Sequence, residues 1–167
     1  MKTLYVVRHA KSSWDDTDLA DIDRPLNDRG KRDAPRMGKR LKEKDIHPEL
    51  LLSSPARRAF STAKRIGEVL NYKKDHIRTE KELYHASERE IFEVVRALPD
   101  KLNTVMIFGH NPGLTDFVNQ LLETKRFIEN IPTCGIVAFS FSGKSWVDVS
   151  KENAQLLFFD YPKSKDD

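Results

Sequence analysis

Three short apolar runs, separated by longer segments with helical spacing, constrain the fold of this chain more than any other feature. The runs occupy residues 4–7, 50–52 and 105–108, and each has the composition of a strand covered on both faces. Between them, apolar residues recur at helical spacing, as at Ala59 and Ala63. This alternation predicts an α/β fold, a three-layer α/β/α sandwich with a mostly parallel central sheet.

The C-terminal part of the chain follows a different pattern. Residues 137–141 and 146–149 flank the sequence Ser-Gly-Lys at 142–144, which is typical of a β-hairpin turn. A further apolar run at residues 156–159 precedes Pro162. We therefore expect an antiparallel edge at this end of the sheet.

The length of the chain fits one compact domain. Its 167 residues lie within the usual size range of a single domain, about 100–200 residues. We expect that domain to span residues 1–162, with a short polar tail at 163–167, and to be a monomer. No apolar run approaches the roughly 20 residues that cross a bilayer, so we expect no membrane association.

Charge and cysteine content narrow the function classes further. The chain has 29 Lys and Arg against 26 Asp and Glu, a net charge of +3, and the two signs are interleaved as in residues 39–45. This pattern is typical of a solvated helix face and disfavours nucleic-acid binding. The single cysteine, Cys134, and an N-terminus without a signal-peptide pattern favour the cytoplasm. The acidic residues between 15 and 23 lack metal-ligand spacing, so we expect a solvated loop, no metal and no cofactor.

Histidines and arginines follow the predicted parallel strands, at the point where each strand ends. Arg8 and His9 follow the first strand, Arg57 and Arg58 come shortly after the second, and His110 follows the third. Ligands of open α/β sheets collect at this edge. An imidazole is a good nucleophile toward phosphorus, and arginine forks hold phosphoryl oxygens. The pattern therefore predicts phosphoryl chemistry.

These segments resemble a known family. Residues 8–10 (RHA), 54–59 (SPARRA) and 109–111 (GHN) are similar to motifs of the histidine phosphatase superfamily, also called the phosphoglycerate mutase-like fold. Residues 8–14 (RHAKSSW), 24–30 (RPLNDRG) and 109–114 (GHNPGL) resemble the SixA-type phosphohistidine phosphatase branch. The resemblance covers nearly the whole chain.

The resemblance implies a role for each matching residue. His9 would be the nucleophile that is transiently phosphorylated, and Arg8 would contact the phosphoryl group. The family's arginine directly precedes an alanine, which selects Arg58 over Arg57. His110 would donate a hydrogen bond to the phosphoryl oxygens in its protonated state.

Residues of less certain role surround this set. Many family members carry an acid that protonates the leaving oxygen, and Glu82 is a better candidate for it than Glu80. A site without a strong acid would favour labile phosphoramidates, because imidazole leaves more easily than an alkoxide. We expect His47, His76 and His85 to be structural or surface residues. We expect further substrate contacts from Lys11, Ser12, Arg57 and Asn111.

The sequence thus favours a metal-independent phosphatase that forms a phosphohistidine intermediate. Its expected substrate is a phosphohistidine on a partner protein, because a chain of this size has no room for a large lid over the site. Two alternatives stay open: a phosphatase for small phosphoesters, and a non-catalytic module that binds a phosphorylated protein. A metal-dependent phosphohydrolase and a nucleic-acid binder are less compatible with the pattern.

Overall fold

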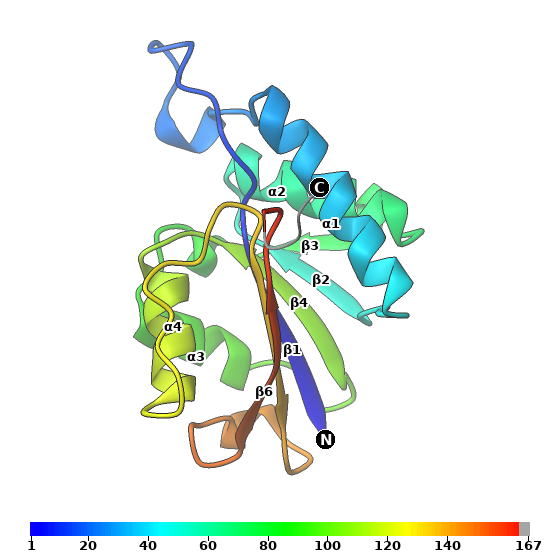
Figure 1. Cartoon of the computed structure of the whole chain (residues 1–167), viewed down its shortest axis with the longest axis vertical. Helices are drawn as coiled ribbons and strands as arrows, with labels where there is room; N and C mark the ends of the chain where they lie inside the picture. Colours follow the sequence, from blue (N-terminus) through cyan, green and yellow to red (C-terminus); the bar gives the residue numbers. More distant parts are fainter. Residues whose placement is uncertain (164–167) are drawn as a thin grey trace.

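The computed structural model describes residues 1–163 and contains one six-stranded mixed sheet between two pairs of helices (Figure 1). The strands lie in the order β3-β2-β4-β1-β5-β6. Their bounds are β1 Lys2–Arg8, β2 Leu50–Ser53, β3 Ile77–Thr79, β4 Thr104–Gly109, β5 Ile136–Phe141 and β6 Ala154–Asp160. The α-helices are α1 Asp28–Glu43, α2 Arg57–Val69, α3 Glu88–Arg96 and α4 Gly113–Leu122.

Strand direction divides the sheet in two. β1, β2, β3 and β4 pair in parallel, whereas β5 runs antiparallel to β1 and β6 antiparallel to β5. This confirms the expected mostly parallel sheet with an antiparallel C-terminal edge. The carboxyl ends of β1, β2 and β4 consequently lie at one edge of the molecule.

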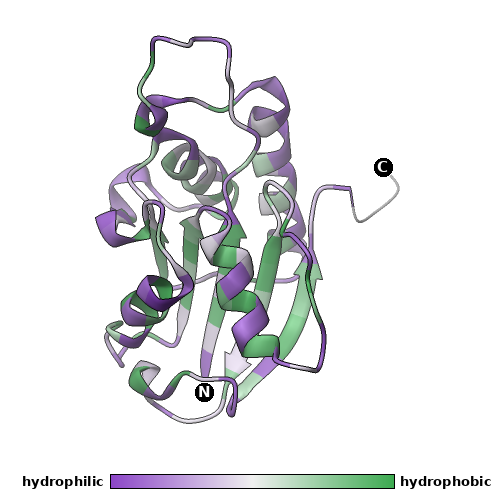
Figure 2. Ribbon diagram, turned by 90° about the vertical axis from the view of Figure 1, so that its left-hand side faces the viewer, coloured by the Kyte–Doolittle hydropathy of each residue, from purple (hydrophilic) through white to green (hydrophobic). Residues whose placement is uncertain are grey.

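The central strands are apolar on both faces because a helix layer covers each face. Leu4 and Val6 of β1 face the cluster that includes α3 and α4, whereas Tyr5 and Val7 face the cluster that includes α1 and α2. Figure 2 shows the apolar strands inside and the hydrophilic helix surfaces outside. The three-layer α/β/α prediction is confirmed. Within residues 1–163, none of the helices is long and apolar enough to span a membrane.

One local prediction is wrong, and one short strand has no sequence signal. Residues Trp146–Asp148 form a short 3-10 helix, η4, and the hairpin partner of β5 is β6. The prediction of a strand at 146–149 is wrong because Trp146 is fully buried in the core, where its indole Nε1 donates to the Leu102 carbonyl at 2.8 Å. Strand β3 had no sequence prediction, since Ile77 is its one buried residue.

Candidate active site

The ends of the parallel strands bring the predicted histidines and arginines together around one pocket. Arg8 ends β1 in register with Gly109 of β4, so His9 and His110 leave the sheet side by side. Their ring centroids lie 5.3 Å apart. The pocket has a volume of about 260 Å³, and its lining includes the predicted residues Arg8, His9, Lys11, Ser12, Arg58, His110 and Asn111.

His9 is held as a neutral imidazole with one nitrogen available. Its Nδ1 lies 2.7 Å from the carbonyl oxygen of Ala10, and a carbonyl can only accept, so Nδ1 carries the proton. The Nε2 lone pair is therefore free to attack an electrophile. Burial, with the nearby Arg58 and Arg8 acting in the same direction, lowers the pKa of His9 to about 4. The ring is consequently a competent nucleophile at neutral pH.

His110 is also neutral in the free site, which corrects the expectation of a protonated ring. Burial lowers its pKa to about 3, with His9 and Arg58 acting in the same direction. The Ser54 hydroxyl lies 2.8 Å from Nε2 of His110 and accepts from the Ala56 amide, so its own hydrogen can bond to Nε2. In that arrangement Nδ1 carries the hydrogen. A neutral His110 can therefore still donate to a phosphoryl oxygen.

Two buried polar atoms at the pocket have no partner in the part of the chain that the structure describes: the Nε of Arg8 and the Nδ1 of His110. The Nη1 of Arg8 donates to the Ile131 carbonyl at 2.9 Å, which fixes the direction of the guanidinium. The Asn111 amide nitrogen donates to the same carbonyl at 3.0 Å. Both atoms are therefore free to donate to an acceptor that enters the pocket, such as a phosphoryl oxygen.

The site also contains a carboxylate, Asp21, for which the sequence predicted no functional role. Asp21 lies in the short 3-10 helix η1, Asp21–Asp23, and its Oδ2 accepts from Arg58 Nη2 at 3.0 Å and from the Tyr84 hydroxyl at 2.6 Å. Its Oδ1 accepts from Arg24 Nη1 at 3.1 Å, and Oδ2 also lies 3.1 Å from His85 Nε2. These bonds hold the pKa of Asp21 far below its usual value, and the bond from the Tyr84 hydroxyl has the largest effect. Asp21 is thus an ionised anchor, and the solvated-loop prediction is wrong for it.

The sequence also predicted no functional role for Arg24 and His85, which both contact Asp21. The motif at residues 24–30 indicates the family but no role for Arg24, whose Nε donates to the Ser13 carbonyl and whose guanidinium stacks on Trp14 at 3.3 Å. His85 is exposed, as the sequence predicts, but it also lines the pocket. A histidine directly after a tyrosine carries no recognisable pattern, so the sequence offered no signal for His85.

Two predicted site residues lie outside the pocket. Glu82 belongs to the short 3-10 helix η3, Lys81–Leu83, where its side chain is exposed and its backbone N–H bonds to Glu80. Arg57 begins α2 with an exposed side chain, one residue before the buried Arg58. Neither lines the pocket, so Glu82 is not placed to protonate a leaving group and Arg57 is not placed to contact a phosphoryl group.

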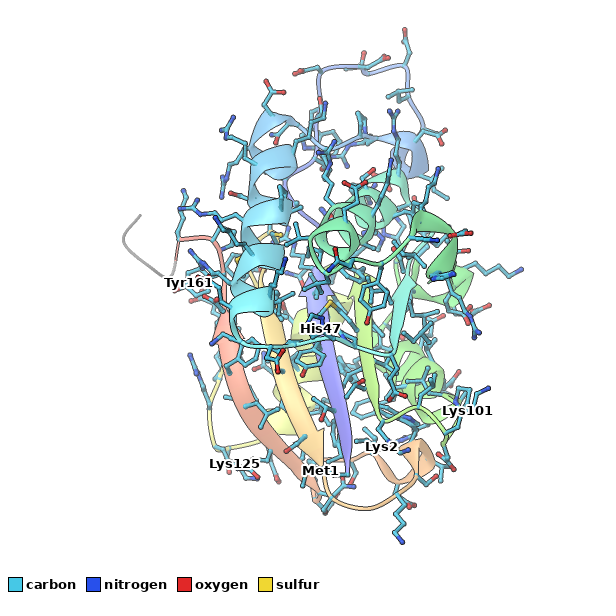
Figure 3. The ribbon with its side chains drawn as sticks, turned by 90° about the vertical axis from the view of Figure 1, so that its right-hand side faces the viewer. Met1, Lys2, His47, Lys101, Lys125 and Tyr161 are labelled. Carbon is cyan, nitrogen blue, oxygen red and sulfur yellow. The ribbon has the colours of Figure 1, made fainter. Side chains whose placement is uncertain are left out.

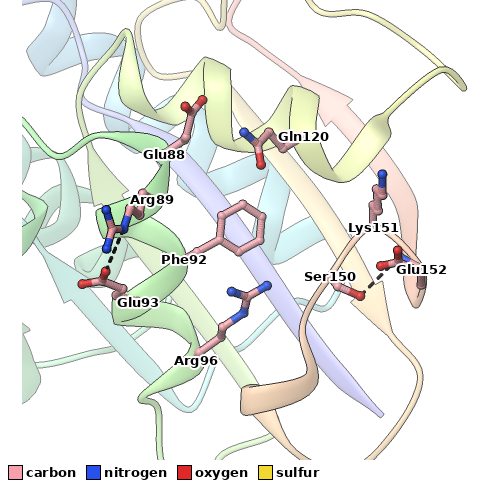
Figure 4. A pocket seen from close by; sticks show the side chains of 9 residues that line it. All are labelled: Glu88, Arg89, Phe92, Glu93, Arg96, Gln120, Ser150, Lys151 and Glu152. Carbon is pink, nitrogen blue, oxygen red and sulfur yellow. Dashed lines mark hydrogen bonds and ion pairs between the residues drawn. The ribbon is translucent and has the colours of Figure 1, made fainter.

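A second groove lies between α3 and the loop before β6, away from the histidines (Figure 4). Its volume is about 480 Å³. Several of its charged side chains are already bonded: Arg89 pairs with Glu93 at 3.4 Å, and Arg96 donates twice to the Val149 carbonyl. The lining lacks a histidine, cysteine or aspartate, so the histidine pocket is the candidate active site.

Comparison with known sequences agrees with this geometry. The sequence profile of the histidine phosphatase superfamily (branch 1) matches residues 4–103. An uncharacterised protein of Mycobacterium tuberculosis is 30% identical over 165 residues, covering 94% of this chain and 100% of that protein.

Comparison with solved structures agrees as well. SixA from Nakamurella multipartitia superposes with a TM-score of 0.82 at 24% identity, over 98% of this chain and 97% of that one. The protein histidine phosphatase SixA complexed with tungstate gives a TM-score of 0.80 at 21% identity, over 96% and 97% of the two chains. The chain therefore belongs to branch 1 of the histidine phosphatase superfamily, as a phosphatase with the fold of SixA.

Proposed function

We propose that the protein is a metal-independent phosphatase that uses His9 as a covalent nucleophile and dephosphorylates phosphohistidine on a partner protein. The observation that carries the mechanism is the hydrogen bond from Nδ1 of His9 to the Ala10 carbonyl, which leaves Nε2 as the attacking atom. The charge that a metal ion would neutralise is met here by guanidinium groups, those of Arg8 and Arg58.

The reaction has two transfers. First, Nε2 of His9 attacks phosphorus, the bond from phosphorus to the leaving group breaks, and the leaving group takes up a proton. Then water attacks the phosphorus of phospho-His9, loses a proton and releases inorganic phosphate together with neutral His9. Arg8, Arg58 and His110 would donate to the phosphoryl oxygens in both steps, where the transferred charge is spread over those oxygens.

A phosphorylated protein suits the shape and charge of this pocket. The pocket is shallow enough to leave Trp14 exposed at its rim and Lys11 exposed beside it. The structurally similar SixA is a protein histidine phosphatase. Small phosphoesters remain the alternative substrate, and binding without turnover is the alternative function. The buried, unpaired thiol of Cys134 fits the reducing cytoplasm that we propose as the compartment.

The test is a single-turnover assay with a phosphohistidine-bearing protein and with p-nitrophenyl phosphate, both in the presence of a chelator. We expect wild type to release phosphate from both, to favour the phosphoprotein, and to carry acid-labile, base-stable phosphate during turnover. His9→Ala should do none of these, whereas His76→Ala, which removes an exposed imidazole, should match wild type. Turnover by His9→Ala would contradict the nucleophile, chelator sensitivity would contradict metal independence, and a preference for p-nitrophenyl phosphate would contradict the protein substrate.

A further inference from the structure

The leaving group of the proposed first transfer takes up a proton, and the structure offers a donor for it in His85. This inference rests on the proposed function and adds one catalytic residue to it. We propose that His85, oriented by Asp21, gives a proton to the leaving group and then takes one from the attacking water.

Position is the first argument. His85 lines the pocket together with His9 and Arg58. Its ring centroid lies 5.6 Å from that of His110, and the His110 ring lies 5.3 Å from His9. The His85 side chain is 57% exposed, so it meets solvent and substrate rather than the core. Because the nucleophile is buried, the leaving group departs toward the mouth of the pocket, and a proton donor there can reach it.

The hydrogen bond to Asp21 is the second argument. The Nε2 of His85 lies 3.1 Å from Oδ2 of Asp21, and an ionised carboxylate only accepts, so Nε2 carries a hydrogen. The Nδ1 of His85 is then the nitrogen that gains and loses a proton. A carboxylate that holds one imidazole nitrogen while the other exchanges protons is a recurring catalytic arrangement.

Other titratable groups near the pocket are poorer donors. Asp21 is ionised, and its pKa is held low by Tyr84 and Arg58. The Tyr84 hydroxyl donates to Asp21, and burial raises the pKa of Tyr84. His9 and His110 are neutral because burial lowers their pKa values to about 4 and about 3. His85 therefore combines a half-exposed imidazole with a carboxylate partner.

The backbone fixes His85 in place. Its φ of 51° lies in the left-handed region, a conformation that non-glycine residues adopt rarely and often at functional sites. The next residue, Ala86, packs against the first residue of α4, since a Cβ on Gly113 would lie 1.9 Å from the Ala86 carbonyl oxygen. The Tyr84 ring lies 4.1 Å from the His85 ring. The turn is thus pinned to α4 on one side and to Asp21 on the other.

The proton balance closes over one cycle. In the first transfer, protonated His85 gives its Nδ1 proton to the leaving group as the phosphorus bond breaks and becomes neutral. In the second transfer, neutral Nδ1 takes a proton from the water that attacks phospho-His9. His85 returns to its protonated form, inorganic phosphate leaves, and no external acid or base is consumed.

The charged and titratable groups facing His85 come from several elements. Asp21 and Tyr84 contact it directly, and Arg58 and His110 lie behind them. The adjoining groove is acidic; it is lined by His85 together with Glu88, Glu90 and Asp116. His85 is thus surrounded by carboxylates on the side of this groove and by Arg58 on the other side of Asp21.

The test compares leaving groups in the first transfer alone. His85→Asn is suitable because asparagine tolerates a left-handed backbone and its amide cannot act as an acid or a base near neutral pH. Stopped-flow bursts of leaving-group release are measured for p-nitrophenyl phosphate, whose leaving group needs little protonation, and phenyl phosphate, whose leaving group needs more. The matched control is His47→Asn, which removes another exposed imidazole, one 3.5 Å from Asp45 (labelled in Figure 3).

We expect His85→Asn to slow the burst with phenyl phosphate by about 100-fold and with p-nitrophenyl phosphate by less than about 10-fold. Equal losses with both substrates would overturn the assignment and leave His85 a positioning residue. Absence of phosphate release by wild type from every phosphorylated substrate would instead contradict the proposed function.

Discussion

Strand β1 has a cationic side chain at each end, and the two side chains differ in whether their hydrogen-bond donors have partners. At the N-terminal end, Lys2 is 2% exposed, and its Nζ donates to the carbonyls of Asp100 and Leu102 and to the Asn103 side chain (Figure 3). At the C-terminal end, Arg8 has a buried Nε without a partner in residues 1–163. The donors of Lys2 therefore all have acceptors, whereas one donor of Arg8 does not.

This difference separates structural from functional burial of charge. All three hydrogens of the Lys2 ammonium have acceptors, and the ammonium lies 5.8 Å from the Trp146 ring, so it joins β1 to the loops at that end. Arg8 and His110 keep buried donors open, which destabilises the free protein slightly. A bound phosphoryl group would satisfy them. Unmet hydrogen bonds thus locate the site better than charge or burial alone.

The largest expected effect is on catalysis at the Arg8 end. Arg8→Ala should lower kcat/KM for p-nitrophenyl phosphate by about 1000-fold, because it removes a donor to the transferring phosphoryl group. The free energy of unfolding should change by less than about 1 kcal/mol, since the lost guanidinium is only partly bonded. Steady-state kinetics and urea unfolding check both. Arg57→Ala, an equal change of charge outside the pocket, should leave kcat/KM near wild type.

The opposite result is expected at the Lys2 end. Lys2→Met should lower the free energy of unfolding by about 3 kcal/mol, because it leaves buried carbonyls without their donor. The kcat of the folded fraction should be unchanged. Urea unfolding of Lys2→Met beside Lys101→Met, which removes an exposed lysine, measures the loss. A kcat that falls in Lys2→Met at a temperature where it is folded would break the contrast between the two ends.

The pH dependence of stability should come largely from the histidine end. The pKa values of His9 and His110 are lowered from 6.5 to about 4 and about 3, so the unfolded chain binds more protons below pH 6.5. Stability is therefore full above pH 6.5 and falls as pH is lowered, by about 2 kcal/mol per histidine at pH 5. Urea unfolding at pH 7 and pH 5 should show a smaller drop for His110→Asn than for wild type. An equal drop in both proteins would mean that His110 is not buried as a neutral ring.

The smallest expected effect concerns a hydroxyl behind His110. Ser54→Ala removes the group that fixes the His110 ring through Nε2, and it should lower kcat/KM about 10-fold. Ser53→Ala is the matched control, because the Ser53 hydroxyl donates only to the Ser54 carbonyl in the described chain. Steady-state kinetics of both variants test the role of the bond. Similar losses in the two variants would indicate general disturbance of the strand end.

The sequence predicted the sheet and the histidine pocket because both depend on local patterns. The apolar runs at residues 4–7, 50–52 and 105–108 form central strands, since nothing but a doubly covered sheet buries them. Parallel strands then place Arg8 and His110 at one edge. No contact between distant segments had to be known.

The parts that failed depend on such distant contacts. Asp21 resembles its acidic neighbours in sequence, and only the approach of Arg58 and Tyr84, 37 and 63 residues away, distinguishes it. Glu82 is close to His85 in sequence, but the turn exposes the first and directs the second to the pocket. Tryptophan is common in strands, but Trp146 lies in the 3-10 helix η4 and packs into the core. Composition identifies what a residue prefers, but not which partner it meets.

The segment from residue 9 to residue 27 is anchored at both ends and exposed in the middle. Its base is held by the bond from the Asn27 amide to the Lys11 carbonyl and by the bonds of Arg24 and Asp21, whereas residues 14–18 are exposed and project beyond the helices (Figure 1). The pocket residues and the exposed tip are therefore carried by separable parts of this segment. We expect the tip to accept inserted sequences without loss of the pocket beneath it.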